Sequence, residues 1–229
     1  MRFYILKILF NHHKNVVYII YAQKKDVVSV KERSSFASYL SLNEVKGWLI
    51  NMKVTVTIAR SYGSGGKEIG KELAKQIGAK YYGREIIEML RGEETYDGDD
   101  ESISTLDEAT KQFEQQAKLI HSLAENDSCV IVGRCADYVL RDMDNVIKVY
   151  LYAPIRNCVK RVSRLYELNP DEAKNLVRSM NKTRGDYYEH NTGRKWSEIT
   201  NYDLCLNTAG LTTEQCVEII KNFIQTKIG

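Results

Sequence analysis

Proline is scarce in this chain, and long hydrophobic stretches are missing. The 229 residues include only two prolines, Pro154 and Pro170, which excludes collagen-like and proline-rich proteins. No apolar run approaches the roughly 18 residues that a membrane-spanning helix needs. The best candidate is the short segment from Val16 to Ala22. We therefore expect no membrane association.

Paired cysteines are also missing. The five cysteines form no C-x-x-C pair and show no metal-ligand spacing. Their odd number and wide separation predict reduced, mostly buried thiols in a cytoplasmic protein rather than a disulfide framework. We expect no metal centre built from such residues. The cysteines are Cys129, Cys135, Cys158, Cys205 and Cys216.

The chain has no large excess of charge of either sign, with 33 Lys and Arg against 30 Asp and Glu. The small positive surplus is unevenly distributed. Residues 1–51 carry eight basic and three acidic side chains, and residues 52–229 carry 25 basic and 27 acidic side chains. The main part of the chain is therefore not basic, and we expect no nucleic-acid partner. Its 43% hydrophobic and 28% charged residues are ordinary for a folded globular protein.

A break in composition falls at Met52. Lys53 and a β-branched run from Val54 to Ala59 follow it directly, which is how many cytosolic domains begin. We interpret residues 1–51 as an N-terminal extension that a mis-assigned start codon would add, and residues 52–229 as the functional domain. A genuine short N-terminal arm is the alternative.

From Met52 onward, apolar runs alternate with segments of helical periodicity. Strands are predicted at residues 54–59, 81–82, 128–132, 146–152 and 203–206. Helices are predicted at 67–77, 85–90, 106–124, 155–168 and 213–227, with an acidic exposed loop at 92–101. Pro170 suits the first turn of a further helix. The alternation predicts an α/β fold in which helices cover both faces of a five-stranded parallel sheet, a three-layer sandwich.

The turn after the first strand is rich in glycine and ends in a lysine. Backbone N–H groups at such a strand-to-helix turn make an anion site. Gly66 and Lys67 match the phosphate-binding pattern G-x-x-x-x-G-K-[ST], whereas Ser61 replaces its first glycine and Glu68 replaces the Ser or Thr that contacts Mg²⁺. A G-x-G-x-x-G dinucleotide motif fails at Glu68, and a plain glycine-rich turn is the alternative. The candidate phosphate cradle is Gly63, Ser64, Gly65, Gly66, Lys67 and Glu68.

Arginines follow at two further places. Arg134 comes directly after the strand at 128–132, at the edge where open α/β sheets bind ligands, and its guanidinium can clamp a phosphate through two hydrogen bonds. A basic segment runs from Arg178 to Lys195, and Arg161 precedes it. A helical, arginine-bearing lid of this kind would neutralise phosphate charge and exclude water. A solvated basic helix is the alternative.

Together these motifs resemble the cytidylate kinase-like family, a branch of the P-loop nucleoside monophosphate kinases. The similarity rests on residues 58–69, 81–85, 130–137, 187–188, 192–196 and 201–207, and it covers nearly all of the chain from Met52 onward. It implies a P-loop kinase fold, with ATP and Mg²⁺ as the donor complex and CMP or dCMP as the acceptor. Both substrates are small molecules.

The resemblance also implies roles for single residues. Gly83 stands where the family often carries Asp, and Glu68 leaves the Mg²⁺ contact unassigned. A kinase for another small acceptor and a non-catalytic nucleotide-binding regulator are the alternatives; Glu68 favours the regulator, and the lid favours transfer. Carried over by position, Lys67, Arg178 and Arg184 are catalytic, Arg84, Arg134 and Arg161 bind the acceptor, and Gly63, Ser64, Gly65, Gly66, Lys67 and Glu68 bind the donor.

Overall fold

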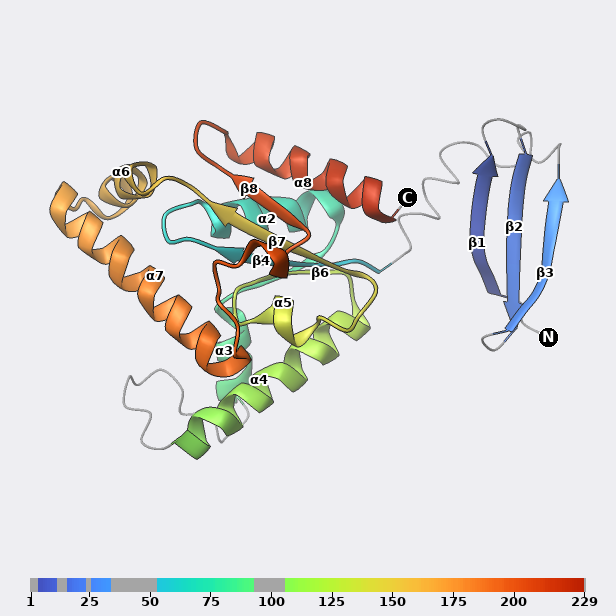
Figure 1. The fold of residues 1–229 in the computed structure, drawn as a ribbon, viewed down its shortest axis with the longest axis horizontal. Helices are drawn as coiled ribbons and strands as arrows, with labels where there is room; N and C mark the ends of the chain where they lie inside the picture. The colour runs from blue at the N-terminus through green and yellow to red at the C-terminus, as the bar shows by residue number, and fades with distance from the viewer. Residues whose placement is uncertain (1–3, 12–15, 24–25, 34–52, 93–105, 229) are drawn as a thin grey trace. The chain divides into compact units, whose positions relative to one another are not determined.

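The computed structural model describes residues 4–11, 16–23, 26–33, 53–92 and 106–228 (Figure 1). The chain divides into two compact units, residues 1–52 and 53–229. The first unit contains an antiparallel sheet in the order β1-β2-β3, for which the sequence analysis predicts no strands. Its strands are β1 (Tyr4–Asn11), β2 (Val16–Gln23) and β3 (Asp26–Arg33).

A five-stranded sheet forms the centre of the second unit. All its neighbouring strands pair in parallel, in the order β5-β6-β4-β7-β8. This arrangement confirms the predicted sheet, and each predicted strand is present with its ends shifted by at most one residue. The strands are β4 (Thr55–Arg60), β5 (Lys80–Tyr82), β6 (Cys129–Val132), β7 (Val146–Tyr152) and β8 (Leu204–Asn207).

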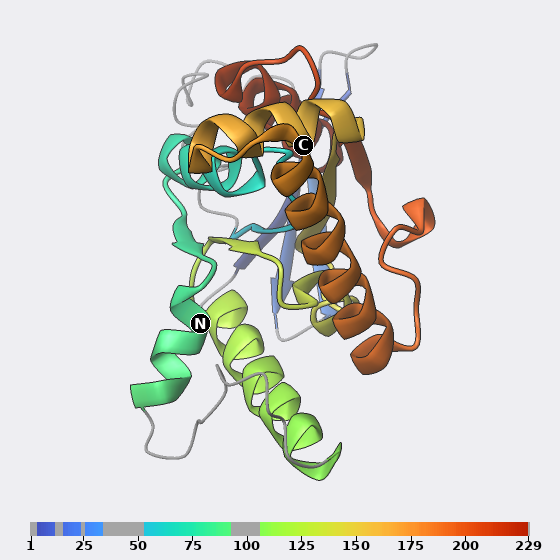
Figure 2. The same ribbon diagram turned by 90° about the vertical axis from the view of Figure 1, so that its left-hand side faces the viewer.

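Helices cover both faces of this sheet (Figures 1 and 2). Val56 and Ile58 of β4 pack toward α2 and α8, whereas Cys129 and Ile131 of β6 pack toward α3, α4 and α5. Burial on both sides explains why the strands consist of nearly continuous apolar runs. The covering helices are α2 (Gly66–Ile77), α3 (Glu85–Gly92), α4 (Leu106–Asn126), α5 (Ala136–Val139) and α8 (Thr213–Ile228).

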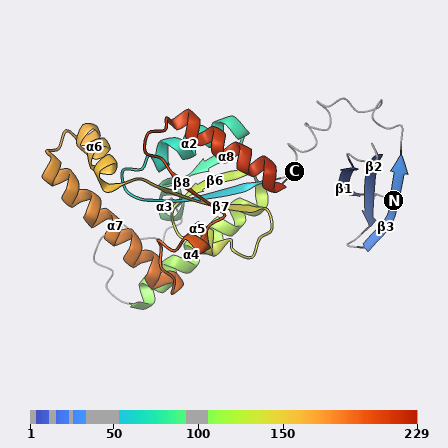
Figure 3. The ribbon, with the colours of Figure 1, turned by 45° about the horizontal axis from the view of Figure 1, so that its top comes forward.

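Two further helices, α6 (Ile155–Tyr166) and α7 (Pro170–Thr192), pack against each other beside the sheet (Figure 3). The Asn169 side chain accepts a hydrogen bond from Glu172 N at 2.9 Å, and the Glu172 carboxylate accepts one from Asn169 N at 3.1 Å. This reciprocal cap fixes the start of α7. Pro170 is its first residue, in agreement with the sequence analysis.

Two short helices were not predicted, α5 and the 3₁₀ turn η2 (Ile199–Asn201). The expected acidic loop at 92–101 lies almost entirely outside the described residues. Within the part of the chain that the structure describes, no helix combines the length and the hydrophobicity of a membrane span.

Candidate active site

The glycine loop joins the end of β4 to the start of α2. Gly63 and Gly65 have φ angles of 85° and 87°, which residues other than glycine rarely adopt. A Cβ at Gly63 would lie 2.9 Å from the carbonyl oxygen of Cys158 on α6. The buried Ser64 side chain donates to Ser61 O at 2.9 Å and thereby holds the loop closed. The N–H groups of the first turn of α2 have no partner within the helix, and such groups can bind an anion.

Lys67 and Glu68 lie in the first turn of α2, and both are exposed. Glu68 pairs with Arg161 of α6, with 3.4 Å between Oε2 and Nη2. The Arg161 guanidinium carbon also lies 3.1 Å from the position that a Cβ on Gly65 would take. The structure therefore places Arg161 against the glycine loop, with the candidate donor residues.

The lid helix α7 contacts the same loop. Asn181 Oδ1 accepts a hydrogen bond from Tyr62 N at 2.7 Å. Three residues further along α7, Arg184 donates from Nη1 to Arg60 O at 3.1 Å, and its guanidinium lies 5.1 Å from the centre of the Tyr62 ring. Arg178 is exposed one turn before Asn181. Of the two predicted lid arginines, Arg184 is the one that these contacts hold at the loop.

The loop after β6 forms a second wall of the site. Gly133, Arg134 and Cys135 all have left-handed backbone, with φ angles of 85°, 61° and 53°. For residues other than glycine this conformation costs roughly 1–2 kcal/mol. The buried Gln116 of α4 donates from Nε2 to Arg134 O at 3.2 Å and so supports the loop. Strained backbone of this kind clusters at functional sites.

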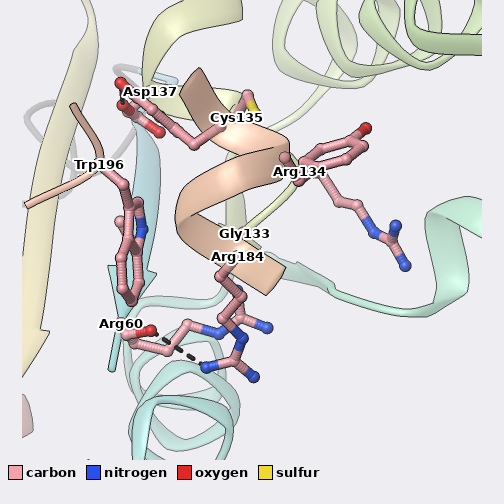
Figure 4. A pocket seen from close by; sticks show the side chains of 10 residues that line it. Arg60, Gly133, Arg134, Cys135, Asp137, Arg184 and Trp196 are labelled. Carbon is pink, nitrogen blue, oxygen red and sulfur yellow. Dashed lines mark hydrogen bonds between the residues drawn. The ribbon is translucent and has the colours of Figure 1, made fainter. Parts of the chain in front are cut away.

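A cavity of about 50 Å³ lies at the end of β4, between the loop after β6 and α7 (Figure 4). The loop after β4 leads to α2 on one face of the sheet, and the loop after β6 leads to α5 on the other. Open α/β sheets bind ligands at such a divergence of loops, beyond the carboxyl ends of the strands. The cavity is lined by Ala59, Arg60, Gly133, Arg134, Cys135, Asp137, Arg184, Tyr187, Tyr188 and Trp196.

Three arginines line the cavity, and no carboxylate of the described residues pairs with them. Burial, together with the positive charges of Arg184 and Arg134, lowers the pKa of Arg60 to about 9. Among the described residues of the lining, Asp137 is the acidic one. It accepts a hydrogen bond from the Tyr188 hydroxyl at 2.6 Å, and burial raises the pKa of its carboxyl group. Figure 4 shows Asp137 at the end of the cavity opposite Arg60 and Arg184. An anionic ligand would supply the negative charge with which these arginines can pair.

The structure thus brings Arg134 and Arg184 together and adds Arg60, which the sequence analysis did not select. Its position, a charged residue that ends a buried strand at the ligand-binding edge, was a usable signal. Gln116 was also missed. Arg84 is exposed at the start of α3 and is not part of the cavity lining.

A glycine loop at the end of a central parallel strand, with arginines of α6 and α7 beside it, is typical of phosphotransferases of the P-loop kinase fold. Residues 55–210 match the cytidylate kinase-like family. The chain belongs to this family, in agreement with the sequence analysis.

Relatives with assigned names agree with this membership. The cytidylate kinase of Methanopyrus kandleri is 24% identical over 182 residues, which is 76% of this chain and 94% of that protein. The cytidylate kinase of Pyrococcus horikoshii is 24% identical over 177 residues, 74% of this chain and 87% of the other.

Solved structures confirm the fold. An uncharacterized protein from Eubacterium ventriosum superimposes with a TM-score of 0.65 at 26% identity, over 76% of this chain and 99% of that chain. A shikimate kinase from Bacteroides thetaiotaomicron gives a TM-score of 0.50 at 17% identity, over 75% of this chain and 98% of its own. At that identity the likeness to shikimate kinase shows the fold alone.

Proposed function

We propose that this protein transfers the terminal phosphoryl group of ATP to a nucleoside monophosphate, with CMP or dCMP as the acceptor. The family and the cytidylate kinases among the relatives support this choice. The observation that carries it is the cavity lined by Arg60, Arg134 and Arg184 beside a glycine loop. A nucleoside monophosphate brings a phosphate dianion, which is the charge that these guanidinium groups need.

On the donor side, the loop from Gly63 to Lys67 would hold the ATP phosphates through its backbone N–H groups, with Lys67 adding a positive charge. Glu68 fits Mg²⁺, because the ion prefers oxygen ligands and uses one or two carboxylates together with substrate phosphates. Among the described residues, no group of three or more acidic, His or Cys side chains forms an all-protein metal site. When bound, the ion would neutralise charge on the donor phosphates.

On the acceptor side, Arg134 and Arg184 would bind the phosphate of the monophosphate. A hydrogen bond to a charged group contributes about 1.5–3 kcal/mol. The cavity of about 50 Å³ holds only a few water-sized groups; it suits a phosphate, and the nucleoside would extend out of it. With α7 over the two phosphates, the site excludes water and aligns the reacting groups, which is most of what phosphoryl transfer requires.

The test is a coupled assay of ADP release with Mg²⁺-ATP and separate acceptors: CMP, dCMP, UMP, AMP, GMP and shikimate. We expect CMP or dCMP to give the highest kcat/KM, well above the rate without acceptor. Turnover with shikimate but with none of the nucleotides would show that the acceptor is another small molecule. ATP binding without transfer to any acceptor would favour a nucleotide-binding regulator.

We also propose that residues 52–229 are sufficient for this activity. A chain that begins at Met52 should melt at nearly the same temperature as the full chain and keep its turnover. A large loss of either property on removal of residues 1–51 would show that this segment belongs to the functional domain.

A further inference from the structure

Arg60 occupies a channel that two glycines leave open. The Arg60 Cγ lies 2.7 Å from where a Cβ on Gly66 would stand, and its Nη1 lies closer still to where a Cβ on Gly133 would stand. Gly66 opens α2, at the candidate donor site, and Gly133 precedes Arg134 on the acceptor wall. The Arg60 side chain therefore runs from one phosphate site toward the other.

Within the part of the chain that the structure describes, no carboxylate pairs with Arg60, as one would with a structural arginine. The charged groups that act on it are Arg184 and Arg134, which oppose its charge. Arg184 is held in place through the backbone oxygen of Arg60, not through its side chain. A guanidinium in this position raises the energy of the empty protein, because its charge is partly desolvated beside two like charges. Such an arrangement is stabilised when an anion binds.

We propose that Arg60 contacts the phosphoryl group during its transfer, as an arginine supplied by the same chain between the donor and acceptor sites. This proposal rests on the kinase function proposed above. In the step, the bond between the γ-phosphorus of ATP and its bridging oxygen breaks, and the electron pair stays on ADP. A bond forms between that phosphorus and a phosphate oxygen of the acceptor. Arg60 exchanges no proton; it neutralises charge on the oxygens of the transferred group, which is the role of arginine in related phosphoryl transfers.

The test compares Arg60→Met, Arg60→Lys and the matched control Arg141→Met. Arg141 is an exposed arginine outside the cavity that has a carboxylate partner, Asp142, at 3.5 Å. We expect Arg60→Met to lower kcat at least ~100-fold, the scale of losing one strong electrostatic stabiliser, while KM for ATP and CMP changes less than about threefold. Arg60→Lys keeps the charge and should recover part of kcat, and Arg141→Met should match the wild type.

A second readout separates this role from a structural one. The melting temperature of ligand-free Arg60→Met should equal or exceed that of the wild type, since one of three opposing charges is gone. ADP with aluminium fluoride and CMP, a mimic of the group in transfer, should stabilise the wild type and lose most of this effect in Arg60→Met. ADP alone should stabilise both proteins equally.

Three results would overturn the proposal: unchanged kcat in Arg60→Met, a raised KM for CMP at unchanged kcat, or a melting temperature that falls enough to account for the lost activity. If none of the acceptors in the panel leads to ADP release by the wild type, the proposed function and this inference are both overturned. An active wild type with an equally active Arg60→Met would overturn the inference alone.

Discussion

The glycine loop and the arginine cavity both suit phosphates, but they differ in how they produce a positive potential. The loop relies on backbone N–H groups and Lys67, and Glu68 beside it already pairs with Arg161 of α6. The cavity relies on guanidinium groups that no carboxylate pairs with in the described ranges. We therefore expect an anion to stabilise the cavity more than the loop. This difference supports our proposal that the donor binds at the loop and the acceptor's phosphate in the cavity.

The largest effect should come from the loop. Lys67→Ala should lower turnover at least ~100-fold, because it removes a positive charge from the donor phosphates. The melting temperature should hold, since Lys67 is exposed. Steady-state kinetics and thermal melting measure both effects, with Lys75→Ala, an exposed lysine at the other end of α2, as the control. A folded Lys67→Ala protein with full turnover would show that the loop does not bind the donor phosphates as proposed.

Arg134→Lys tests the cavity. Lysine keeps the charge but loses the planar fork, so CMP binding should weaken roughly tenfold or more while ATP binding barely changes. Separate titrations of CMP and ATP measure this, followed through the fluorescence of Trp196, which lines the cavity; Arg141→Lys is the control. If ATP binding weakened and CMP binding stayed unchanged, the donor and acceptor assignments of the two phosphate sites would be reversed.

The Glu68–Arg161 pair sharpens the same contrast. Arg161→Ala should weaken ATP binding about fivefold, the equivalent of about 1 kcal/mol for a partly exposed charge contact, and leave CMP binding unchanged. The free energy of unfolding should change by less than about 1 kcal/mol, because the side chains of Arg161 and Glu68 are 32% and 47% exposed. A selective loss of CMP binding would show instead that Arg161 binds the acceptor, as the family resemblance implies.

The smallest effect should come from Asp137→Asn. The carboxylate is bonded to Tyr188 rather than to the arginines, so CMP affinity should change less than about twofold. Because burial raises the pKa of Asp137 above its ordinary 3.8, the folded state holds the proton more tightly. The wild type should lose stability relative to Asp137→Asn as the pH rises from 3.8 through the raised pKa. A strong loss of CMP binding in the variant would mean that Asp137 contacts the acceptor.

The sequence predicts the parallel sheet well, because local patterns carry that information. The strands β4 and β7 are β-branched runs buried on both faces, and Pro170 marks the start of α7. The glycine loop and Arg134 also follow from position alone, since both come directly after buried strands. In these places, short-range pattern and tertiary packing agree.

The features that were missed depend on contacts between distant segments. Arg60 looks like the polar end of a strand until Gly66 and Gly133 are seen to leave space for it. Gln116 is one polar position in an amphipathic helix, and only the loop that it supports explains its burial. The helix α5 has four residues, too few to show a period. Pairing of β1, β2 and β3 is likewise a property of three segments taken together.

The most direct test is a crystal structure of the protein with CMP and a non-hydrolysable ATP analogue. The account predicts the CMP phosphate within hydrogen-bond distance of Arg134 and Arg184, and the donor phosphates on the N–H groups of the loop from Gly63 to Lys67. The guanidinium of Arg60 should lie between the two. A CMP phosphate bound away from the three arginines, or donor phosphates within the cavity, would contradict it.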